Sequence, residues 1–175
     1  MARSSNWSSS WTPRRWRCWP EGSDMRIASA GPRIDPAAQR AALREAIGAF
    51  YTARQAGDVA SFAHYFAPDA RLFVLGNPVL NPGSGMRLGR PDIVSYLRHI
   101  HATNDYLDFT LVSVVAEGDT IAVWWRARIK ARSNNGEGTF DNLDQMRIRN
   151  GQIIELAQFF DTGAFAIMKG RIPLP

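Results

Sequence analysis

The chain of 175 residues, 45% hydrophobic and 21% charged, has the composition of one globular domain with an appendage. Its net charge of +5 is concentrated in residues 1–34, where six arginines face only two acidic residues, while residues 35–175 are close to neutral. A near-neutral domain lacks the basic surface that nucleic-acid binding requires, and no apolar run reaches the roughly 18 residues of a membrane span, so we expect neither kind of partner.

Residues 1–34 are rich in Ser, Trp and Arg and hold four of the six tryptophans, without helical or strand periodicity. We expect a disordered tail here and a single folded domain over residues 35–175. Cys18 is the only cysteine, which rules out an intramolecular disulfide and is compatible with a cytoplasmic protein.

Two helices are expected at the start of the folded domain. Asp35 caps the first, whose apolar residues recur at helical spacing until Gly57 ends it. Asp58 caps a shorter second helix, which Pro68 and the aspartate after it should end.

A short strand over residues 71–75 is expected next, followed by a Gly-, Pro- and Asn-rich segment over 76–89 that is a candidate rim over a pocket. Pro91 opens a third helix. From residue 106 the apolar period becomes two, which indicates strands over 106–116, 120–132, 140–149 and 152–160. Helices followed by an antiparallel meander predict an α+β fold in which the helices cover the apolar face of the sheet.

The Asn150-Gly151 turn joins the last two predicted strands, and its length decides which side chains share a face. A two-residue loop would place Met146 and Ile148 beside Glu155. A three-residue loop with Gly151 in the left-handed conformation, forming a bulge, gives one predominantly apolar face, and we favour it on that ground. This face consists of Phe140, Asn142, Asp144, Met146, Ile148, Ile154, Leu156, Gln158 and Phe160.

Asn142, Asp144 and Gln158 are the three polar residues on this otherwise apolar face. An unpaired buried carboxylate costs roughly several kcal/mol, so Asp144 should be protonated, hydrogen-bonded or in the wall of a cavity. Two readings remain open. Either Asn142 or Gln158 simply satisfies the carboxyl group, or the carboxyl group serves a function.

Five short segments of the sequence, each different, follow one another along the chain: residues 50–58, 66–70, 89–93, 117–123 and 147–153. Their order and spacing resemble the NTF2-like superfamily, in particular its SnoaL-like and ketosteroid-isomerase-like branch, over about residues 37–165. The resemblance implies a cone in which three helices lie against a curved sheet and enclose a hydrophobic pocket for a small molecule, in a homodimer. It does not fix a reaction, because members of one fold serve many functions.

Ketosteroid isomerases use an Asp base together with an oxyanion hole made of a Tyr and a protonated Asp. By alignment these positions are Val74, Phe50 and Asp144, so only the last is kept, and Tyr51 is expected to point elsewhere on its helix unless the alignment slips by one residue. SnoaL-type cyclases use an acidic side chain in the pocket as general acid or base for a substrate with an enolisable carbonyl. The resemblance implies this role for Asp144.

Asn142 and Gln158 would then orient the substrate, with Met146, Leu156 and Phe160 as apolar walls. Trp124 and Arg126 are further candidates for substrate binding if the even-numbered side of strand 120–132 faces the pocket. The odd-numbered side of that strand is more uniformly apolar, so its orientation stays open, and the face that lies outside is a candidate dimer interface.

No HExxH, CxxC or P-loop spacing is present, so we expect no metal and no cofactor. Asp161 is expected to cap a turn into residues 164–168. Two hypotheses follow. The first is a cofactor-independent isomerase, cyclase or lyase that uses Asp144 as general acid or base, which requires a cavity at this residue. The second is a non-catalytic ligand-binding or dimerisation module, in which Asp144 is fully paired.

Overall fold

We analysed a computed structural model of the chain, which describes residues 36–172. The Trp- and Arg-rich segment 1–34 and the expected helix cap at Asp35 lie outside these residues. The described part has the predicted α+β architecture, with helices preceding a mixed and mostly antiparallel sheet. No helix within it is long and apolar enough to cross a membrane.

Four helices are present among the described residues: α1 (Pro36–Gln55), α2 (Val59–Ala63), α3 (Gly89–Thr103) and α4 (Thr162–Met168). The chain leaves α1 through Gly57, whose φ of 68° is a left-handed conformation that glycine adopts readily. Asp58 caps α2 as predicted, because its carboxylate accepts a hydrogen bond from the Ser61 amide at 3.1 Å. Asp161 caps α4, also as predicted, by accepting from the amides of Gly163 and Ala164.

Six strands form one sheet in the order β2-β1-β6-β5-β4-β3. Only the pairing of β1 with β6 is parallel. The strands are β1 (Phe66–Val74), β2 (Gly85–Leu88), β3 (Asn104–Glu117), β4 (Thr120–Ala131), β5 (Glu137–Arg149) and β6 (Gln152–Phe160).

The start of β1 was predicted wrongly. Phe66 does not end a helix but begins the strand, pairing with Ile153, and Pro68 lies within β1. An irregularity between Phe66 and Arg71 accommodates this proline, since a bulge leaves residues out of the hydrogen-bonded ladder. The expected rim over residues 76–89 contains the short strand β2 in addition to loop.

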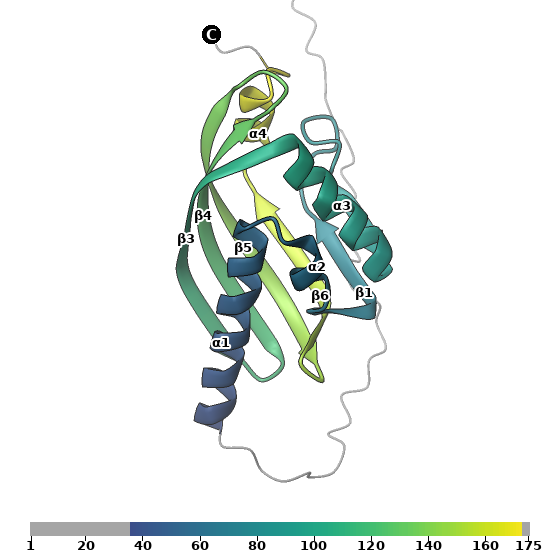
Figure 1. Cartoon of the computed structure of the whole chain (residues 1–175), viewed down its shortest axis with the longest axis vertical. Coiled ribbons are helices and arrows are strands. Elements are labelled where there is room, and N and C mark those ends of the chain that lie inside the picture. The colour runs from purple at the N-terminus through teal and green to yellow at the C-terminus, as the bar shows by residue number, and fades with distance from the viewer. Residues whose placement is uncertain (1–35, 173–175) are drawn as a thin grey trace, which may run out of the picture. The chain divides into compact units, whose positions relative to one another are not determined.

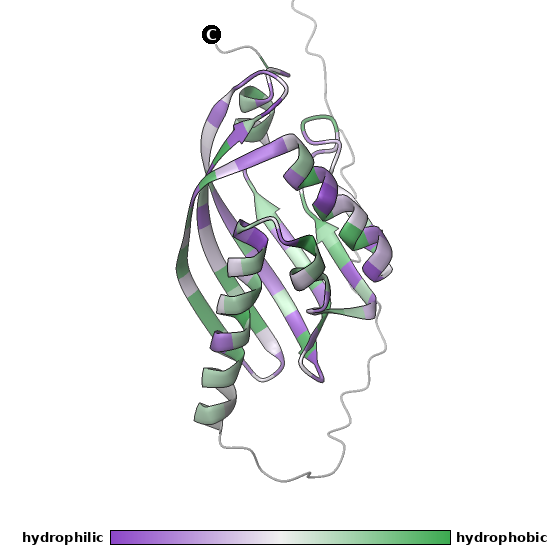
Figure 2. Cartoon of the chain, in the orientation of Figure 1, coloured by the Kyte–Doolittle hydropathy of each residue, from purple (hydrophilic) through white to green (hydrophobic). Residues whose placement is uncertain are grey.

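Helices α1, α2 and α3 lie in a layer over one face of the sheet (Figure 1), and polar and apolar residues alternate along the strands (Figure 2). The core lies between these two layers. Its largest fully buried side chains include Trp125, Tyr51, Phe50, Phe62 and Phe66. Phe50 meets four aromatic neighbours edge to face: Tyr51, Phe62, Tyr65 and Phe66.

The β5–β6 hairpin confirms the predicted grouping of Asn142, Asp144 and Met146 with Leu156, Gln158 and Phe160. Near the turn, however, Ile148 pairs with the buried Ile153 and not with Ile154, and the turn differs from the one predicted. Arg149 pairs directly with Gln152, so the loop has two residues, and both Asn150 (φ 52°) and Gly151 (φ 74°) are left-handed, as a type I′ turn requires. A register shift then follows between Arg147 and Ile148, and it moves the rest of β6 by one residue. The bulge therefore lies inside the hairpin and restores the apolar face that a three-residue loop would have produced.

We expect Gly151→Ala to destabilise the domain by about 1–2 kcal/mol, since an added Cβ meets no atom within 4 Å and the cost comes from the left-handed backbone alone. Gly48→Ala is the matched control, because its Cβ also meets open space but lies in the interior of α1, where alanine stabilises by about 0.5–1 kcal/mol. Urea unfolding curves of both variants test the opposite signs. Equal shifts in the same direction would contradict this account of the turn.

Candidate functional site

A buried network of hydrogen bonds surrounds the carboxylate of Asp144, which is completely inaccessible to solvent. Its Oδ2 accepts from the Tyr51 hydroxyl at 2.5 Å, from Trp125 Nε1 at 2.9 Å and from Arg54 Nη1 at 3.1 Å. Its Oδ1 accepts from Gln158 Nε2 at 3.0 Å. Four donors therefore saturate this carboxylate, and one of them is a cation.

Three structural elements bring these donors together. Tyr51 and Arg54 are three residues apart on α1, which places them on the same face of the helix. Trp125 lies on β4 two residues from Val123, the cross-strand partner of Asp144, so both side chains point to the same side of the sheet. Gln158 lies directly opposite Asp144 on β6.

The donors define the charge state of the network. Trp125 and Arg54 can only donate to Oδ2 of Asp144 and Gln158 Nε2 can only donate to Oδ1, so both carboxyl oxygens act as acceptors. Burial by itself lowers the pKa of Arg54, but the adjacent Asp144 outweighs it and the net pKa is raised, so Arg54 stays charged. Burial and then the Asp144 charge raise the pKa of Tyr51 well above its usual value, which keeps its hydroxyl protonated.

Arg54 also lies against aromatic rings. Its guanidinium carbon is 4.7 Å from the centre of the Trp125 ring and 5.9 Å from that of Tyr51. Cation–π contacts of this kind partly replace the water that burial removes from the guanidinium. In the sequence, Arg54 follows Ile47, Phe50 and Tyr51 at helical spacing, and a charged residue in this apolar row is the signal that could have revealed its role.

The structure confirms that Asn142, Asp144 and Gln158 share the buried face, each being at most 6% exposed. Gln158, one of the two candidates, bonds to Asp144, whereas Asn142 donates to the Phe140 carbonyl at 3.3 Å. The expectation that Tyr51 points away is wrong, and its hydrogen bond to Asp144 agrees with the alternative in which the alignment slips by one residue. Neighbouring residues on a helix differ by about 100° in direction, and α1 is buried over a wide enough arc to take both Phe50 and Tyr51 inside.

Trp124 and Arg126 lie on the opposite face of the sheet from Asp144, which corrects their expected place at the pocket. Trp124 is 41% exposed, and its Nε1 donates to Asp141 at 2.8 Å. Arg126 pairs with the same carboxylate through two 3.0 Å hydrogen bonds. The odd-numbered side of β4 faces the helices instead, because it is the uniformly apolar side and burial selects it.

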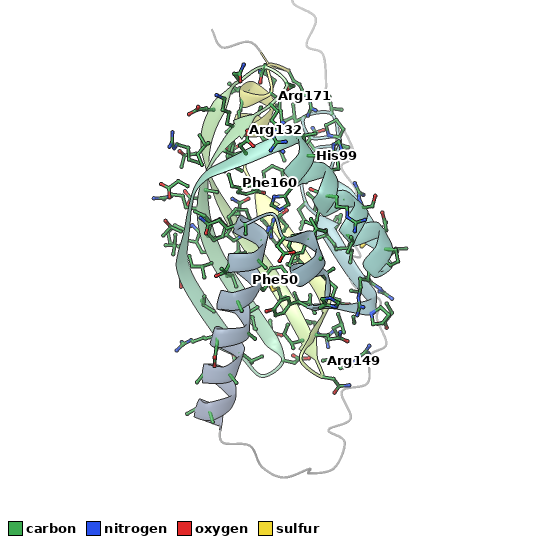
Figure 3. The ribbon with its side chains drawn as sticks, viewed as in Figure 1. Phe50, His99, Arg132, Arg149, Phe160 and Arg171 are labelled. Atoms are coloured by element: carbon green, nitrogen blue, oxygen red, sulfur yellow. The ribbon has the colours of Figure 1, made fainter. Side chains whose placement is uncertain are left out.

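A small cavity of about 40 Å³, the inner cavity, lies beside the network. Phe50 and Phe160 lie on the inner side of the sheet (Figure 3), and Phe160 contributes to the cavity wall. Asp144 does not line the cavity, although its partners Arg54, Trp125 and Gln158 do. The remaining wall residues are Asn81, Tyr96, Leu97, Ile100, Asn104, Tyr106, Ile129, Phe140, Asn142 and Phe165.

Among the other residues expected at the pocket, Met146, Leu156, Val74 and Phe50 are packed in the core rather than in the cavity wall. Each is at most 3% exposed, and neighbouring apolar side chains surround it. Their part is to hold the sheet and helices together around the network.

Two buried polar atoms of the cavity residues find no hydrogen-bond partner among the described residues. These are Nε of Arg54, a donor, and Oδ1 of Asn104, an acceptor. Nε2 of His101 is a third such atom, but His101 does not line the cavity, and burial followed by the Arg54 charge lowers its pKa to about 4. Buried polar atoms are nearly always paired, so an unpaired donor and an unpaired acceptor on two residues of one cavity wall are unusual.

Two tyrosines add hydroxyl groups to the wall. Burial raises the pKa of Tyr96 to about 12, and burial likewise raises that of Tyr106, although the Arg54 charge opposes the shift in both cases. Both are therefore neutral hydroxyls at physiological pH and can donate a hydrogen bond.

A surface cleft of about 650 Å³, the outer cleft, adjoins the inner cavity. The two spaces have five wall residues in common: Asn81, Tyr96, Ile100, Asn104 and Phe165. No group of three or more His, Cys, Asp or Glu side chains that could hold a metal ion occurs among residues 36–172.

The helical layer, the six-stranded mixed sheet and the cavity between them define an NTF2-like α+β protein, the fold found in the similar solved structures. The model of the SnoaL-like domain family matches residues 47–156, more than half of the chain. The chain belongs to the SnoaL-like domain family. None of the curated protein sequences compared with it matches significantly.

Three solved structures illustrate the shared fold. A Rhodopseudomonas palustris protein named as a candidate isomerase aligns with a TM-score of 0.65 and 18% identity, over 73% of this chain and 97% of its own. A Catenulispora acidiphila protein with a ketosteroid-isomerase-like fold, in complex with trimethylamine, has a TM-score of 0.63 and 14% identity, over 74% and 94%. TerC, co-crystallised with polyporic acid, has a TM-score of 0.61 and 21% identity, over 71% and 95%.

We expect Asp144→Asn to lower the free energy of unfolding by about 3–5 kcal/mol, because Arg54 would remain buried without a counter-charge. Asp141→Asn is the matched control on the same strand. Its carboxylate is half exposed and pairs with Arg126 on the outer face, so the free energy of unfolding should stay close to that of the unchanged protein. Urea denaturation measures both, and equal losses would show that burial of the pair is not the cause.

Proposed function

We propose that this domain binds a small apolar molecule that carries a carboxylate or a polarised carbonyl, with Arg54 as its polar anchor. The observation that carries the proposal is the buried Nε–H of Arg54 at the inner cavity, which has no partner among the described residues. A ligand oxygen at this position would satisfy a charged donor, one of the stronger hydrogen bonds available to a protein. The unpaired Oδ1 of Asn104 would accept from a ligand hydroxyl or amide.

The size of the two spaces supports a division of the ligand between them. A volume of about 40 Å³ holds a polar head group of a few atoms, since one water molecule needs roughly 10–15 Å³ by this measure. The body of the ligand would extend past Tyr96 and Phe165 into the outer cleft, whose 650 Å³ lies within the usual range of ligand sites. Solved relatives of the same fold hold small molecules, which favours this proposal over a purely structural role.

Catalysis on the bound carbonyl is the second candidate. In this form the protein is a cofactor-independent isomerase, cyclase or lyase, and Arg54, Tyr96 and Tyr106 stabilise the negative charge that develops on the carbonyl oxygen. Asp144 is the candidate general acid or base, with Gln158 and Asn142 orienting the substrate. The four donors around Asp144 oppose a direct proton transfer from substrate, so this candidate requires one of them, such as the Tyr51 hydroxyl, to carry the proton.

We expect Arg54→Lys to weaken ligand binding by about tenfold or more, because lysine keeps the charge beside Asp144 but lacks the planar guanidinium, whose separate nitrogens can donate to Asp144 and to a ligand at the same time. The ligand is sought first by native mass spectrometry of the full chain as isolated, and then by titration with hexanoate, octanoate and benzoate. Arg126→Lys, on the outer face, is the control and should bind as the unchanged protein does. Equal affinity in all three proteins would remove Arg54 from the site.

The catalytic candidate is tested on the same samples. Enolisable ketones related to any ligand found are incubated with the protein in heavy water, and exchange of the α-proton is followed by NMR. Exchange that is lost in Tyr51→Phe and retained in Arg126→Lys would support catalysis through the network. Binding without exchange would support the non-catalytic ligand-binding module.

A cytoplasmic homodimer completes the proposal. Trp124, Leu143 and Phe159 form a row of cross-strand neighbours on the outer face of β4, β5 and β6, each about two-fifths exposed. Together with Asp141 and Asp161 they border a shallow hollow, and exposed apolar patches of this kind mark interaction surfaces. A second copy of the chain is the occupant that the family resemblance favours.

We expect Leu143→Lys to convert the dimer to monomer, because it places a charge in the centre of the apolar row. Val79→Lys is the control, since this valine is also exposed but lies in the loop before β2. Sedimentation velocity of the full chain measures the change in mass. A dimer that persists in Leu143→Lys, or an unchanged protein that is already monomeric, would exclude this interface.

A further inference from the structure

Most exposed arginines of the strands are neutralised by carboxylates close to them. These pairs are Arg126–Asp141, Arg128–Glu137, Arg132–Asp105, Arg147–Asp119, Arg147–Glu155 and Arg149–Asp69, with separations of 2.6 to 3.4 Å. The sheet surface therefore carries little unbalanced charge, in agreement with the near-neutral composition of the domain.

In the described part of the chain, the outer cleft has three cations, Arg87, Lys169 and Arg171, which bond to backbone carbonyls and not to carboxylates. Arg87 donates to the Gly83 carbonyl at 3.1 Å, and Arg171 donates to the Leu80 carbonyl at 3.0 Å. Lys169 donates to the carbonyl of Thr103 at 3.3 Å. Within residues 36–172 none of the three cations forms an ion pair with a carboxylate.

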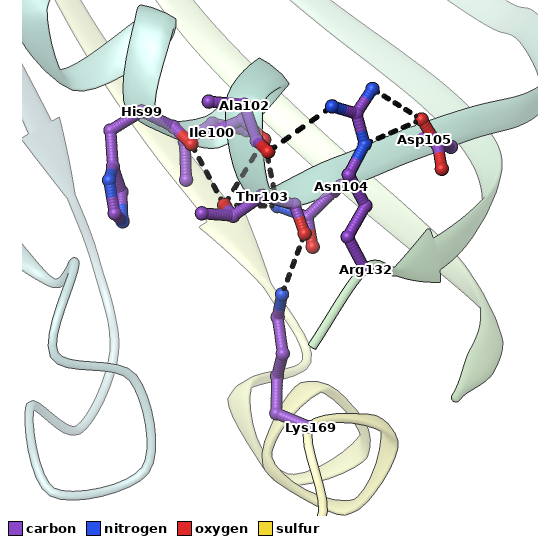
Figure 4. Close-up of polar contacts among 8 residues, drawn as sticks. All are labelled: His99, Ile100, Ala102, Thr103, Asn104, Asp105, Arg132 and Lys169. Carbon is purple, nitrogen blue, oxygen red and sulfur yellow. Dashed lines mark hydrogen bonds and ion pairs between the residues drawn. The ribbon is translucent and has the colours of Figure 1, made fainter. Parts of the chain in front are cut away.

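Figure 4 shows a cation bonded to a backbone carbonyl close to a cation bonded to a carboxylate. Lys169 reaches the carbonyl of Thr103 at the end of α3, while Arg132 nearby is bonded to the carboxylate of Asp105. His99 and Arg171 lie toward the same end of the domain (Figure 3), and both line the cleft.

Among the described residues, Asp92 is the single carboxylate in the cleft wall, against three cations. It accepts a hydrogen bond from the Leu88 amide at 3.0 Å and so serves the start of α3. Partial burial lowers the pKa of Lys169, and the charge of Arg171 lowers it further. Lys169 and Arg171 therefore repel each other, and a bound anion would relieve that repulsion.

The cleft shares five wall residues with the inner cavity, which Arg54 also lines. The cleft offers cations that no described carboxylate neutralises, whereas the inner cavity offers a guanidinium whose charge Asp144 already balances. A concave surface lined with charge of one sign focuses the field and raises the local concentration of anions.

We propose that the outer cleft binds an anionic oxygen group, so that the natural ligand is an apolar molecule with an acidic group at each end. One end lies at Arg54, and the other lies among Arg87, Lys169 and Arg171. The proposal rests on the proposed function for the position of the first group and adds the second group to it. Carboxylate and phosphate share the required chemistry, because both accept several hydrogen bonds from arginine and lysine.

The test compares fatty monoacids with diacids of the same length, because the separation of the two groups in the ligand is not fixed in advance. Hexanoate is paired with adipate, octanoate with suberate and decanoate with sebacate, and each is titrated into the full chain by calorimetry at low salt. We expect at least one diacid to bind about tenfold more tightly than its monoacid. The preference should fall to about one in Lys169→Gln/Arg171→Gln and persist in Lys169→Arg/Arg171→Lys, which retains both charges.

Diacids that bind no more tightly than monoacids, or a preference that survives the neutral double variant, would overturn the cleft proposal and leave the role of Arg54 untouched. A monoacid affinity that is unchanged by Arg54→Lys would instead overturn the proposed function. The two failures are therefore distinguishable.

A second measurement does not depend on the inner cavity. Inorganic pyrophosphate is titrated into the unchanged protein and into Lys169→Gln/Arg171→Gln, with Arg126→Gln as a control that removes an arginine from the outer face. Binding lost only in the double variant supports the cleft site and separates phosphate from carboxylate recognition. Equal binding to all three proteins, or none to any, overturns it.

Discussion

The ion pair between Asp144 and Arg54 is the interaction on which the rest of this domain depends. Both side chains are almost fully buried, and neither charge is stable there without the other. The pair joins α1 to the middle of the sheet, and the donors Tyr51, Trp125 and Gln158 complete the shell around the carboxylate. Helix α1 consequently docks in one rotational position, the one that brings both Tyr51 and Arg54 to Asp144.

Arg54 donates to Asp144 through Nη1, while its buried Nε has no hydrogen-bond partner among the described residues. Asp144 thus fixes the position of a charged side chain that lines the inner cavity, and in our proposal this side chain binds the ligand. In our proposal, the cations of the outer cleft that have no carboxylate partner among the described residues bind a second acidic group of the ligand at the mouth of the site.

In the hairpin that carries Asp144, the sequence predicts which side chains lie together but not the backbone path that brings them there. The requirement for one apolar face selected the correct grouping of Asp144 with Gln158, but the structure reaches it by a two-residue turn and a bulge further along. Two different backbone routes give the same pairing, and side-chain periodicity cannot distinguish them. The face of β4 was undetermined in the same way, until packing against the helices placed Trp125 inside and Trp124 outside.

The sequence by itself determined the α+β class, most helices and strands, the caps at Asp58 and Asp161, and a buried acid on β5, because each follows from local propensity and short-range periodicity. Tertiary structure alone decided which partners that acid has, since Tyr51 and Arg54 lie 93 and 90 residues away along the chain. It also decided the size of the cavity and the gathering of the cleft cations, which come from segments far apart in sequence. Local pattern fixes the face on which a side chain lies, whereas the side chain that it meets depends on how those faces pack together.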